Sequence, residues 1–293
     1  MGVLLTQSIL DGLLVGGVYS CVAIGLSLSL GVMRVFNWAQ GDLLMAALYI
    51  AVFSVRNFGI DPYLSILYIA PLMFCLGYVV QNFLLTPLLR RERTREPLSV
   101  LITTAGLSYV IFNGATILFT SNAVGANSEY AFNVWRIGDL FISVTKVVAF
   151  IIALLLTALI QLFLHKTEYG RALRATSQDR EVAALMGMNN QKLYNIASGI
   201  GYACLGVAAG LMAPMYPVSP ATGATFGFKS LVIVVLGGKG SVPGALLGGI
   251  IVGLVESVGG ALTTGIFAQL SIFIIFALIL IIKPTGLLSK DKG

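Results

Sequence analysis

The chain has 293 residues, of which 57% are hydrophobic and only 10% are charged. Because a soluble globular domain carries about 25% charged residues, this composition excludes a soluble enzyme, a nucleic-acid-binding domain and a disordered chain. The sequence therefore predicts an integral membrane protein, in which the net charge of +6 reflects the loops that face the cytoplasm.

The apolar segments predict an all-α, polytopic transmembrane protein with a single domain over residues 1–293. A membrane-spanning helix needs about 20 mostly apolar residues, and continuous apolar character favours helices over a β-barrel. The segments that meet this description are 9–30, 38–55, 63–84, 99–120, 146–164, 193–216, 242–262 and 266–282. With the shorter segment 226–236, this gives about eight full spans plus one short or broken helix, and the short one either crosses the membrane or re-enters it.

The basic residues predict the orientation. Of the 18 Lys and Arg residues, 14 fall on one side if the chain starts outside the cell and 226–236 also crosses. These residues lie at Arg34, in 85–97, in 165–192, at Lys239 and in the C-terminal tail. Because cytoplasmic loops are enriched in Lys and Arg, this side is predicted to be cytoplasmic, with Lys146 and Lys229 at helix edges.

Two glycine-containing breaks interrupt the helical pattern, at 31–41 and 237–244. Each break joins an apolar segment to a new helix and contains one basic residue. Such a correspondence is typical of transporters built from internal repeats, although two ordinary tight turns would leave the same pattern.

Small residues recur every four positions at Gly240, Gly244 and Gly248, and again at Gly12 and Gly16. In lipid, faces with small residues at this spacing let two helix backbones approach closely. We expect these glycines to form helix-packing contacts.

A few polar side chains are predicted at membrane depth and are candidates for a translocation path. They are Asn37, Gln40, Asp42, Asn113 and Glu256. Asp42 is equally well explained by the favourable dipole at a helix N-terminus. Glu256 is a functional candidate because ionisable groups inside the membrane are costly, although a bond to a neighbouring helix or contact with the far interface would also explain it.

The segment 166–192 is much longer than a connector and alternates apolar residues with charges. Ser177 is expected to cap a short amphipathic helix that begins near Gln178, and Gly187 is expected to end it. Such a helix at the cytoplasmic face either docks into a partner or rests on anionic lipid through its arginines.

Catalytic motifs are absent from the sequence, including Gly-x-Ser-x-Gly, His-Glu-x-x-His and the Walker A string. The segment 237–239 resembles a phosphate-binding loop but lacks the earlier glycine and the following Ser or Thr. The three cysteines and the single histidine are isolated from one another. We therefore expect neither an enzyme nor a resident cofactor or metal, and any ATP would be bound by a separate subunit.

Several stretches, read in order, resemble the branched-chain amino-acid importer permeases of the ATP-binding cassette class. Residues 181–187 are similar to that family's cytoplasmic Glu-Ala-Ala-x-x-x-Gly loop, with valine in the second position. Residues 25–42 resemble its first helix break, and residues 235–245 and 283–288 its C-terminal pattern. On this resemblance, which covers nearly the whole chain, it is identified as the smaller of two related permease subunits.

The resemblance implies a set of partners and a location. The partners would be a second permease, two cytoplasmic ATP-binding subunits, an external solute-binding protein and membrane lipid, with no nucleic acid, in a bacterial inner membrane. It also implies that 166–192 couples the permease to the ATPases. The candidate coupling residues are Arg171, Arg174, Arg180, Glu181, Ala183 and Gly187.

The expected solute is a branched-chain or related small amino acid. Trp38 and Gln40 stand where the family usually has phenylalanine and histidine, which leaves urea and other small amides or carboxylates as alternatives within the family. A secondary transporter or channel that works without ATPases, with a polar chain through Asp42 and Glu256, is the alternative from another class.

Overall fold

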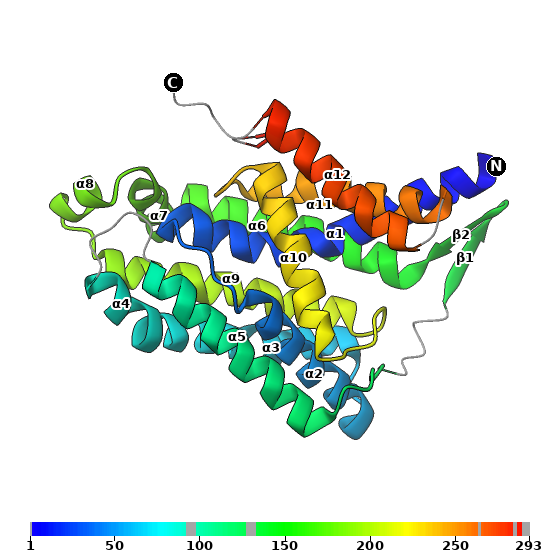
Figure 1. Ribbon diagram of the computed structural model, residues 1–293, viewed down its shortest axis with the longest axis horizontal. Coiled ribbons are helices and arrows are strands. Elements are labelled where there is room, and N and C mark those ends of the chain that lie inside the picture. The colour runs from blue at the N-terminus through cyan, green and yellow to red at the C-terminus, as the bar shows by residue number, and fades with distance from the viewer. Residues whose placement is uncertain (1, 92–97, 127–132, 263–264, 284–285, 289–293) are drawn as a thin grey trace.

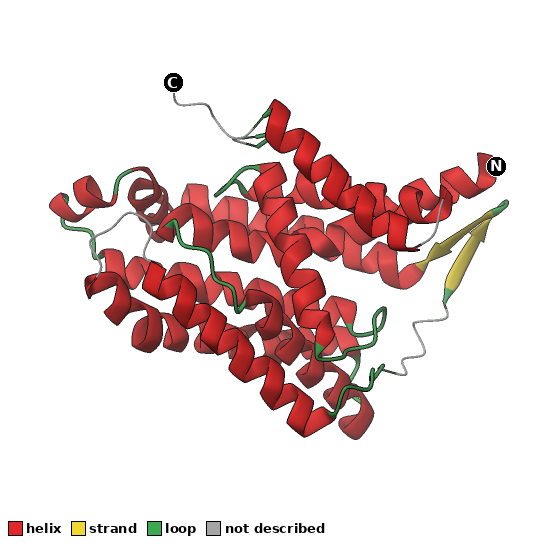
Figure 2. Ribbon diagram, in the orientation of Figure 1, coloured by secondary structure: helices red, strands yellow, loops and turns green. Residues whose placement is uncertain are grey.

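The computed structural model describes residues 2–91, 98–126, 133–262, 265–283 and 286–288, and most of this part is helical (Figure 2). Seven of its helices are long and apolar enough to span a membrane, and two shorter apolar helices accompany them. The predicted all-α transmembrane class is confirmed. The division into long and short helices differs by one, because the segment expected at 266–282 is one of the shorter two.

The elements are labelled along the chain in Figure 1. They are α1 (Gly2–Met33), α2 (Gln40–Phe58), α3 (Pro62–Val80), the π-helical turn η1 (Gln81–Leu85), α4 (Thr86–Arg91), α5 (Leu98–Phe119), β1 (Val134–Ile137), β2 (Leu140–Ser143), α6 (Val144–Lys166), α7 (Glu168–Gln178), α8 (Arg180–Leu185), α9 (Asn190–Met212), α10 (Ala221–Gly237), α11 (Val242–Leu262) and α12 (Gly265–Ile282). The two strands form an antiparallel hairpin in which Val134 pairs with Ser143.

Local sequence signals explain where helices begin and end. Asp61 accepts a hydrogen bond from the Tyr63 amide at 2.8 Å and so caps α3, whose first residue is a proline. Gly59 ends α2 in the left-handed conformation, with φ of 63°. These two devices turn the chain from α2 into α3 within three residues.

The molecule has two distinct ends. The N-terminus and the β1–β2 hairpin lie at one end, and α7 and α8 lie at the other (Figure 1). At the α7–α8 end, Arg34 donates hydrogen bonds to the carbonyl oxygens of Ser177 and Gln178 at 3.1 and 3.2 Å. Lys239 and Arg174 line the same hollow as Arg34. Several basic residues used to predict the orientation lie outside the described part: Arg93, Arg95, Lys290 and Lys292.

Helix α10 returns the chain to the basic end. It begins five residues before the expected segment 226–236 and is about 25 Å long at 1.5 Å per residue. At its end, Leu236 and Gly237 accept backbone hydrogen bonds from Leu287 and Leu288 at 2.8 and 3.2 Å. The described part of the tail therefore lies at the same end as Arg34, as the predicted orientation requires.

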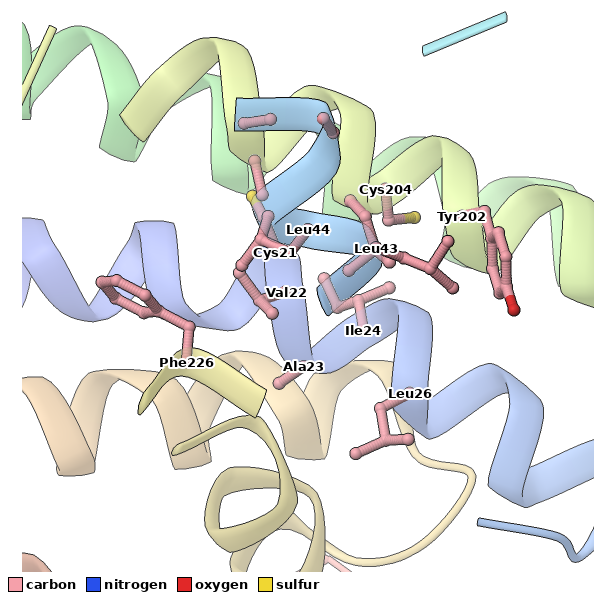
Figure 3. Packing of buried hydrophobic residues seen from close by; sticks show 14 of the residues in the cluster. Cys21, Val22, Ala23, Ile24, Leu26, Leu43, Leu44, Tyr202, Cys204 and Phe226 are labelled. Atoms are coloured by element: carbon pink, nitrogen blue, oxygen red, sulfur yellow. The ribbon is translucent and has the colours of Figure 1, made fainter. Parts of the chain in front are cut away.

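The core is built around α1. In Figure 3, Cys21 and Ile24 of α1 lie among Leu43 and Leu44 of α2 and Cys204 of α9. These side chains are buried. The two cysteines are free thiols that pack as small hydrophobic groups.

Glycines let α11 lie directly against α1. A Cβ atom on Gly16 would lie 2.6 Å from the Ile250 Cα, and a Cβ on Gly249 would lie 2.7 Å from the Gly16 carbonyl oxygen. Gly244 and Gly248 face α10, where they approach the carbonyl oxygens of Gly237 and Ile233. Close backbone contact of this kind supplies van der Waals attraction where lipid removes the hydrophobic driving force.

Gly240 has a different role from the one its spacing predicts. It precedes α11 and has a φ of 82°, a conformation that favours glycine. Its Cα lies against Gly31 at the end of α1, so the two helix breaks meet each other. The residue makes a tight turn against α1 rather than a contact along α11.

Candidate functional site

The first helix break places non-helical backbone inside the bundle. After α1 ends at Met33, the chain runs from the α7 end towards the middle of the molecule before α2 begins (Figure 1). Asn37 holds this segment, because its amide nitrogen donates to the Tyr202 hydroxyl at 2.7 Å and its oxygen accepts from the Ala39 amide at 3.0 Å. At membrane depth, such backbone is tolerated where protein buries it or where it lines a cavity.

The break lines a pocket of about 290 Å³ between α2, α5 and α10. Asn37, Gln40 and Asp42 contribute to its wall from the break and the start of α2, and Ser108 contributes from α5. Ser108 lies ten residues after the start of α5, about 15 Å along a helix, and therefore near the middle of this 22-residue span. The pocket is thus at membrane depth.

Asp42 provides the acidic group of this pocket. Its carboxylate accepts a short hydrogen bond from the Ser108 hydroxyl. Gly223 on α10 leaves room for the carboxylate, because a Cβ atom at that position would collide with Asp42 Oδ1. A second close contact, between Gly41 and the Gly223 carbonyl, brings α2 and α10 together.

The structure brings together three of the five polar residues predicted for a path. Asn37, Gln40 and Asp42 all line the pocket, although Gln40 also donates to the Val22 carbonyl at 3.2 Å and so anchors α2 to α1. Asn113 is not among the lining residues. It is exposed on α5, and its amide donates to the Tyr109 carbonyl of the same helix at 2.8 Å.

Glu256 is also separate from this pocket and forms an ion pair with Lys229. The Lys229 ammonium lies 2.7 and 2.9 Å from the two carboxylate oxygens, and 3.1 Å from the Tyr19 hydroxyl. The expected position of Lys229 at a helix edge is wrong: because α10 begins at Ala221, this lysine lies in the middle of the helix. The sequence analysis did not predict this ion pair. The signal that could have indicated it is that Lys229 and Glu256 are an isolated base and an isolated acid in neighbouring apolar helices.

At the basic end, two short helices replace the single predicted one. Ser177 does not cap a helix, because it lies in the last turn of α7 and donates to the Arg174 carbonyl at 2.8 Å. Asp179 is the cap, accepting from the amides of Glu181 and Val182 at 2.9 and 3.1 Å. The helix end at Gly187 is confirmed by its φ of 82°.

The candidate coupling residues divide between two faces of this region. Ala183 is only 3% exposed and packs against the rest of the protein. Arg171, Arg174 and Glu181 are exposed. Three large apolar side chains on and just after α8 are exposed: Val182 at 55%, Leu185 at 86% and Met186 at 75%. They were not among the candidate coupling residues, although they follow helical spacing in the sequence. We refer to these three residues as the apolar tip.

In the described ranges, His, Cys, Asp and Glu residues do not form a group of three that could hold a metal ion. What the structure presents is a bundle of apolar helices, a mid-membrane pocket at a helix break and an exposed helical tip. These features define the chain as a polytopic α-helical membrane protein with a pocket inside its helix bundle.

Comparison with known protein families identifies the family of the chain. Residues 8–283 match the family model described as the permease component of the branched-chain amino acid transport system, and the chain belongs to this family.

Several curated relatives match along nearly their whole length. The high-affinity branched-chain amino acid transport system permease protein BraD of Pseudomonas aeruginosa is 28% identical, with 98% of this chain and 96% of the relative covered. LivH of Escherichia coli, a protein of the same description, is also 28% identical with the same coverage. The probable permease LivH of Methanocaldococcus jannaschii is 31% identical, over 97% of this chain and 93% of its own.

A solved structure shares the fold. The match is to PsaBC from Streptococcus pneumoniae in complex with Fab, with a TM-score of 0.50 and 15% identity over 96% of this chain and 92% of the other. At this identity the likeness concerns the arrangement of the helices alone.

Proposed function

We propose that this chain is one permease subunit of an ATP-binding cassette importer for branched-chain or related small amino acids in a bacterial inner membrane. It lines half of the translocation path and pairs with a second, similar permease. Two cytoplasmic ATP-binding subunits drive it, and an external solute-binding protein supplies it. The names of its full-length relatives support the solute class, and the pocket at the helix break supports a path through this subunit.

The apolar tip is the observation that carries the link to the ATPases. Val182 and Leu185 on the six-residue helix α8, and Met186 directly after it, expose large apolar side chains at the basic end of the molecule. Exposed apolar surface at the tip of a short helix is typical of a segment that inserts into a partner's groove. Arg171 and Arg174 belong to α7 and are not part of the apolar tip.

Hydrogen bonds connect the tip to the membrane helices. The Asn190 side chain at the start of α9 donates to the Arg180 carbonyl at 2.8 Å. Arg34 at the end of α1 binds the carbonyl oxygens at the end of α7. Motion of a docked ATPase would therefore reach α1 and the break that follows it, where the pocket lies.

In the proposed cycle, the solute-binding protein delivers its solute at the end that carries the β1–β2 hairpin. Closure of the ATPases on ATP then shifts α7 and α8 and opens the pocket towards the cytoplasm. ATP binding supplies the bias between the two states, so the permease needs no strong affinity for its solute.

The structure gives less support to the alternative of a secondary transporter or channel that works without ATPases. Its polar chain would join Asp42 to Glu256, whereas Asp42 contacts Ser108 and Glu256 contacts Lys229 on another side of α10. Urea or other small amides and carboxylates remain solutes to compare within the same family.

Copurification of the tagged chain with its ATPase, followed by solute-stimulated ATP hydrolysis in reconstituted vesicles, tests the proposal. Leu185→Glu with Met186→Glu should abolish ATPase binding while the permease still inserts, because two charges would enter an apolar groove. The matched control is Arg171→Glu with Arg174→Glu, which also introduces two acids in this region. If the arginine pair alone were damaging, contact with anionic lipid would explain the segment and the coupling proposal would be wrong.

A further inference from the structure

We propose that Asp42, with Ser108 beside it, binds the protonated amine of the transported solute in the pocket at the α1–α2 break. The inference rests on the proposed function, because it assumes that the solute passes this pocket. It assigns the amine to this subunit and leaves the solute's carboxylate to groups outside the pocket.

The first argument for an amine site is the charge of the pocket. Asp42 is the one ionisable side chain among the described lining residues. Lys229 is close in sequence to the lining residues Phe228 and Ser230, but its ammonium is paired with Glu256 on another face of α10. A carboxylate at membrane depth without a basic side chain in its own pocket favours a cationic ligand group.

Aromatic rings add to the attraction of the site for cations. Phe36 and Trp38 lie edge to face with their ring centroids 5.4 Å apart, and both line the pocket together with Phe228. The faces of aromatic rings attract ammonium groups. Trp38 is also exposed, so this ring is accessible from outside the pocket that it lines.

An apolar hollow further along the same two helices would accept an aliphatic side chain. Met45, Tyr49 and Phe53 of α2 and Ala115 and Phe119 of α5 line this hollow, which measures about 530 Å³. Residues 42, 45, 49 and 53 follow the spacing of one helix face, as do residues 108, 111, 115 and 119. The carboxylate and the apolar hollow therefore lie along the same pair of helices, α2 and α5.

These two features together match a small amphipathic cation. The amine would bind at Asp42 and the alkyl group would lie towards the apolar hollow, in whose wall Tyr49 and Phe119 stack with centroids 4.3 Å apart. Urea and carboxylates without an amine lack the group that Asp42 recognises. The site thereby distinguishes between the solute classes that the family resemblance leaves open.

A cysteine reporter in the assembled transporter can test the charge and the ligand separately. Ala224 lines the pocket from α10, is exposed and is small, so Ala224→Cys leaves Asp42 and Ser108 intact. Cys21 and Cys204 are buried, and the exposed Cys75 is replaced by serine in the background. The probes are a cationic trimethylammonium-ethyl and an anionic sulfonatoethyl methanethiosulfonate, with L-leucine, isopentylamine and 4-methylpentanoate as competing solutes.

Relative to their rates with a free thiol in solution, the cationic reagent should react on the order of tenfold faster than the anionic one, because Asp42 attracts it. L-leucine and isopentylamine should slow the reaction, whereas 4-methylpentanoate, which has the alkyl chain without the amine, should not. Asp42→Asn should remove both effects and Asp42→Glu should keep the preference for the cation. Ser108→Ala should weaken protection by the amines without reversing the charge preference.

Three results would overturn the amine site: equal protection by 4-methylpentanoate, full protection by L-leucine in Asp42→Asn, or a reporter that reacts with neither reagent. The proposed function has its own readout, which is ATP-dependent uptake of L-leucine by the wild-type complex. Uptake without a cation preference in the pocket would contradict the amine site alone, and a wild-type complex without uptake would contradict the proposed function.

Discussion

At the scale of single residues, the Lys229–Glu256 pair shows how a costly group is retained inside a membrane protein. Lys229 is 9% exposed and lies in an otherwise apolar stretch of α10. Besides the carboxylate, the Tyr19 ring lies 4.7 Å from its ammonium and the Phe226 ring 5.2 Å. The carboxylate and the two ring faces together offset the loss of hydration.

We expect Lys229→Met alone to destabilise the protein by about 3 kcal/mol, because it leaves the partly buried Glu256 carboxylate without its partner. The double variant Lys229→Met with Glu256→Gln should recover most of that loss, since neither charge remains. Thermal unfolding of the detergent-solubilised subunit provides the measurement. A double variant as unstable as the single one would show that packing of the lysine stem, rather than the charge pair, holds α10 in place.

The residue scale also shows what sequence could predict about the site. Asn37, Gln40 and Asp42 are close in the chain, so a single break was enough to place them at one pocket. Asn113 and Glu256 lie in helices that are apolar on nearly every side, and such helices carry little periodicity to indicate which face meets the protein. Their neighbours depend on how each helix rotates against the next, and this information is not local in the sequence.

At the scale of helices, glycine spacing indicated helix packing better than the isolated polar residues did. It predicted close packing along α11, and the structure places Gly244 and Gly248 against α10 and Gly249 against α1. It could not indicate which neighbour each glycine meets, nor that Gly240 belongs to the turn before the helix. Likewise, the charges of 166–192 predicted a helical segment, but Asp179 rather than Ser177 divides it, since either residue is a good cap.

Gly244→Leu should therefore reduce the yield of folded subunit strongly. A Cβ atom at this position would lie 2.2 Å from the Gly237 carbonyl oxygen, which belongs to backbone and cannot rotate away. Gly106→Leu is the matched control, because a Cβ atom on that exposed residue of α5 has nothing within 4 Å. Fluorescence-detected size exclusion of tagged subunits measures both. Equal yields of the two variants would mean that α10 and α11 separate without cost.

At the scale of the whole molecule, the two ends differ in a way that the proposed function requires. Arg34, Arg174 and Lys239 gather at one end with the apolar tip, and the N-terminus and the hairpin occupy the other (Figure 1). The charge pattern anticipated this division because basic side chains resist transfer across the membrane wherever they occur in the chain. The predicted orientation required the segment 226–236 to cross the membrane, and α10, which contains this segment, does return the chain to the basic end.

This division predicts the orientation of the molecule in the membrane, which can be measured directly. In the Cys75→Ser background, Asp139→Cys in the hairpin should react with a membrane-impermeant maleimide in intact cells, because that end faces outwards. Gln178→Cys, at the end of α7, should react only after the membrane is permeabilised, because the basic end is retained in the cytoplasm. Both positions are exposed, so burial does not explain a difference in labelling. Labelling of Gln178→Cys from outside would invert the molecule and place the apolar tip where a cytoplasmic ATPase cannot reach it. The coupling proposal would then be wrong even if the pocket still bound an amine, since solute recognition depends on Asp42 and not on which end faces the cell interior.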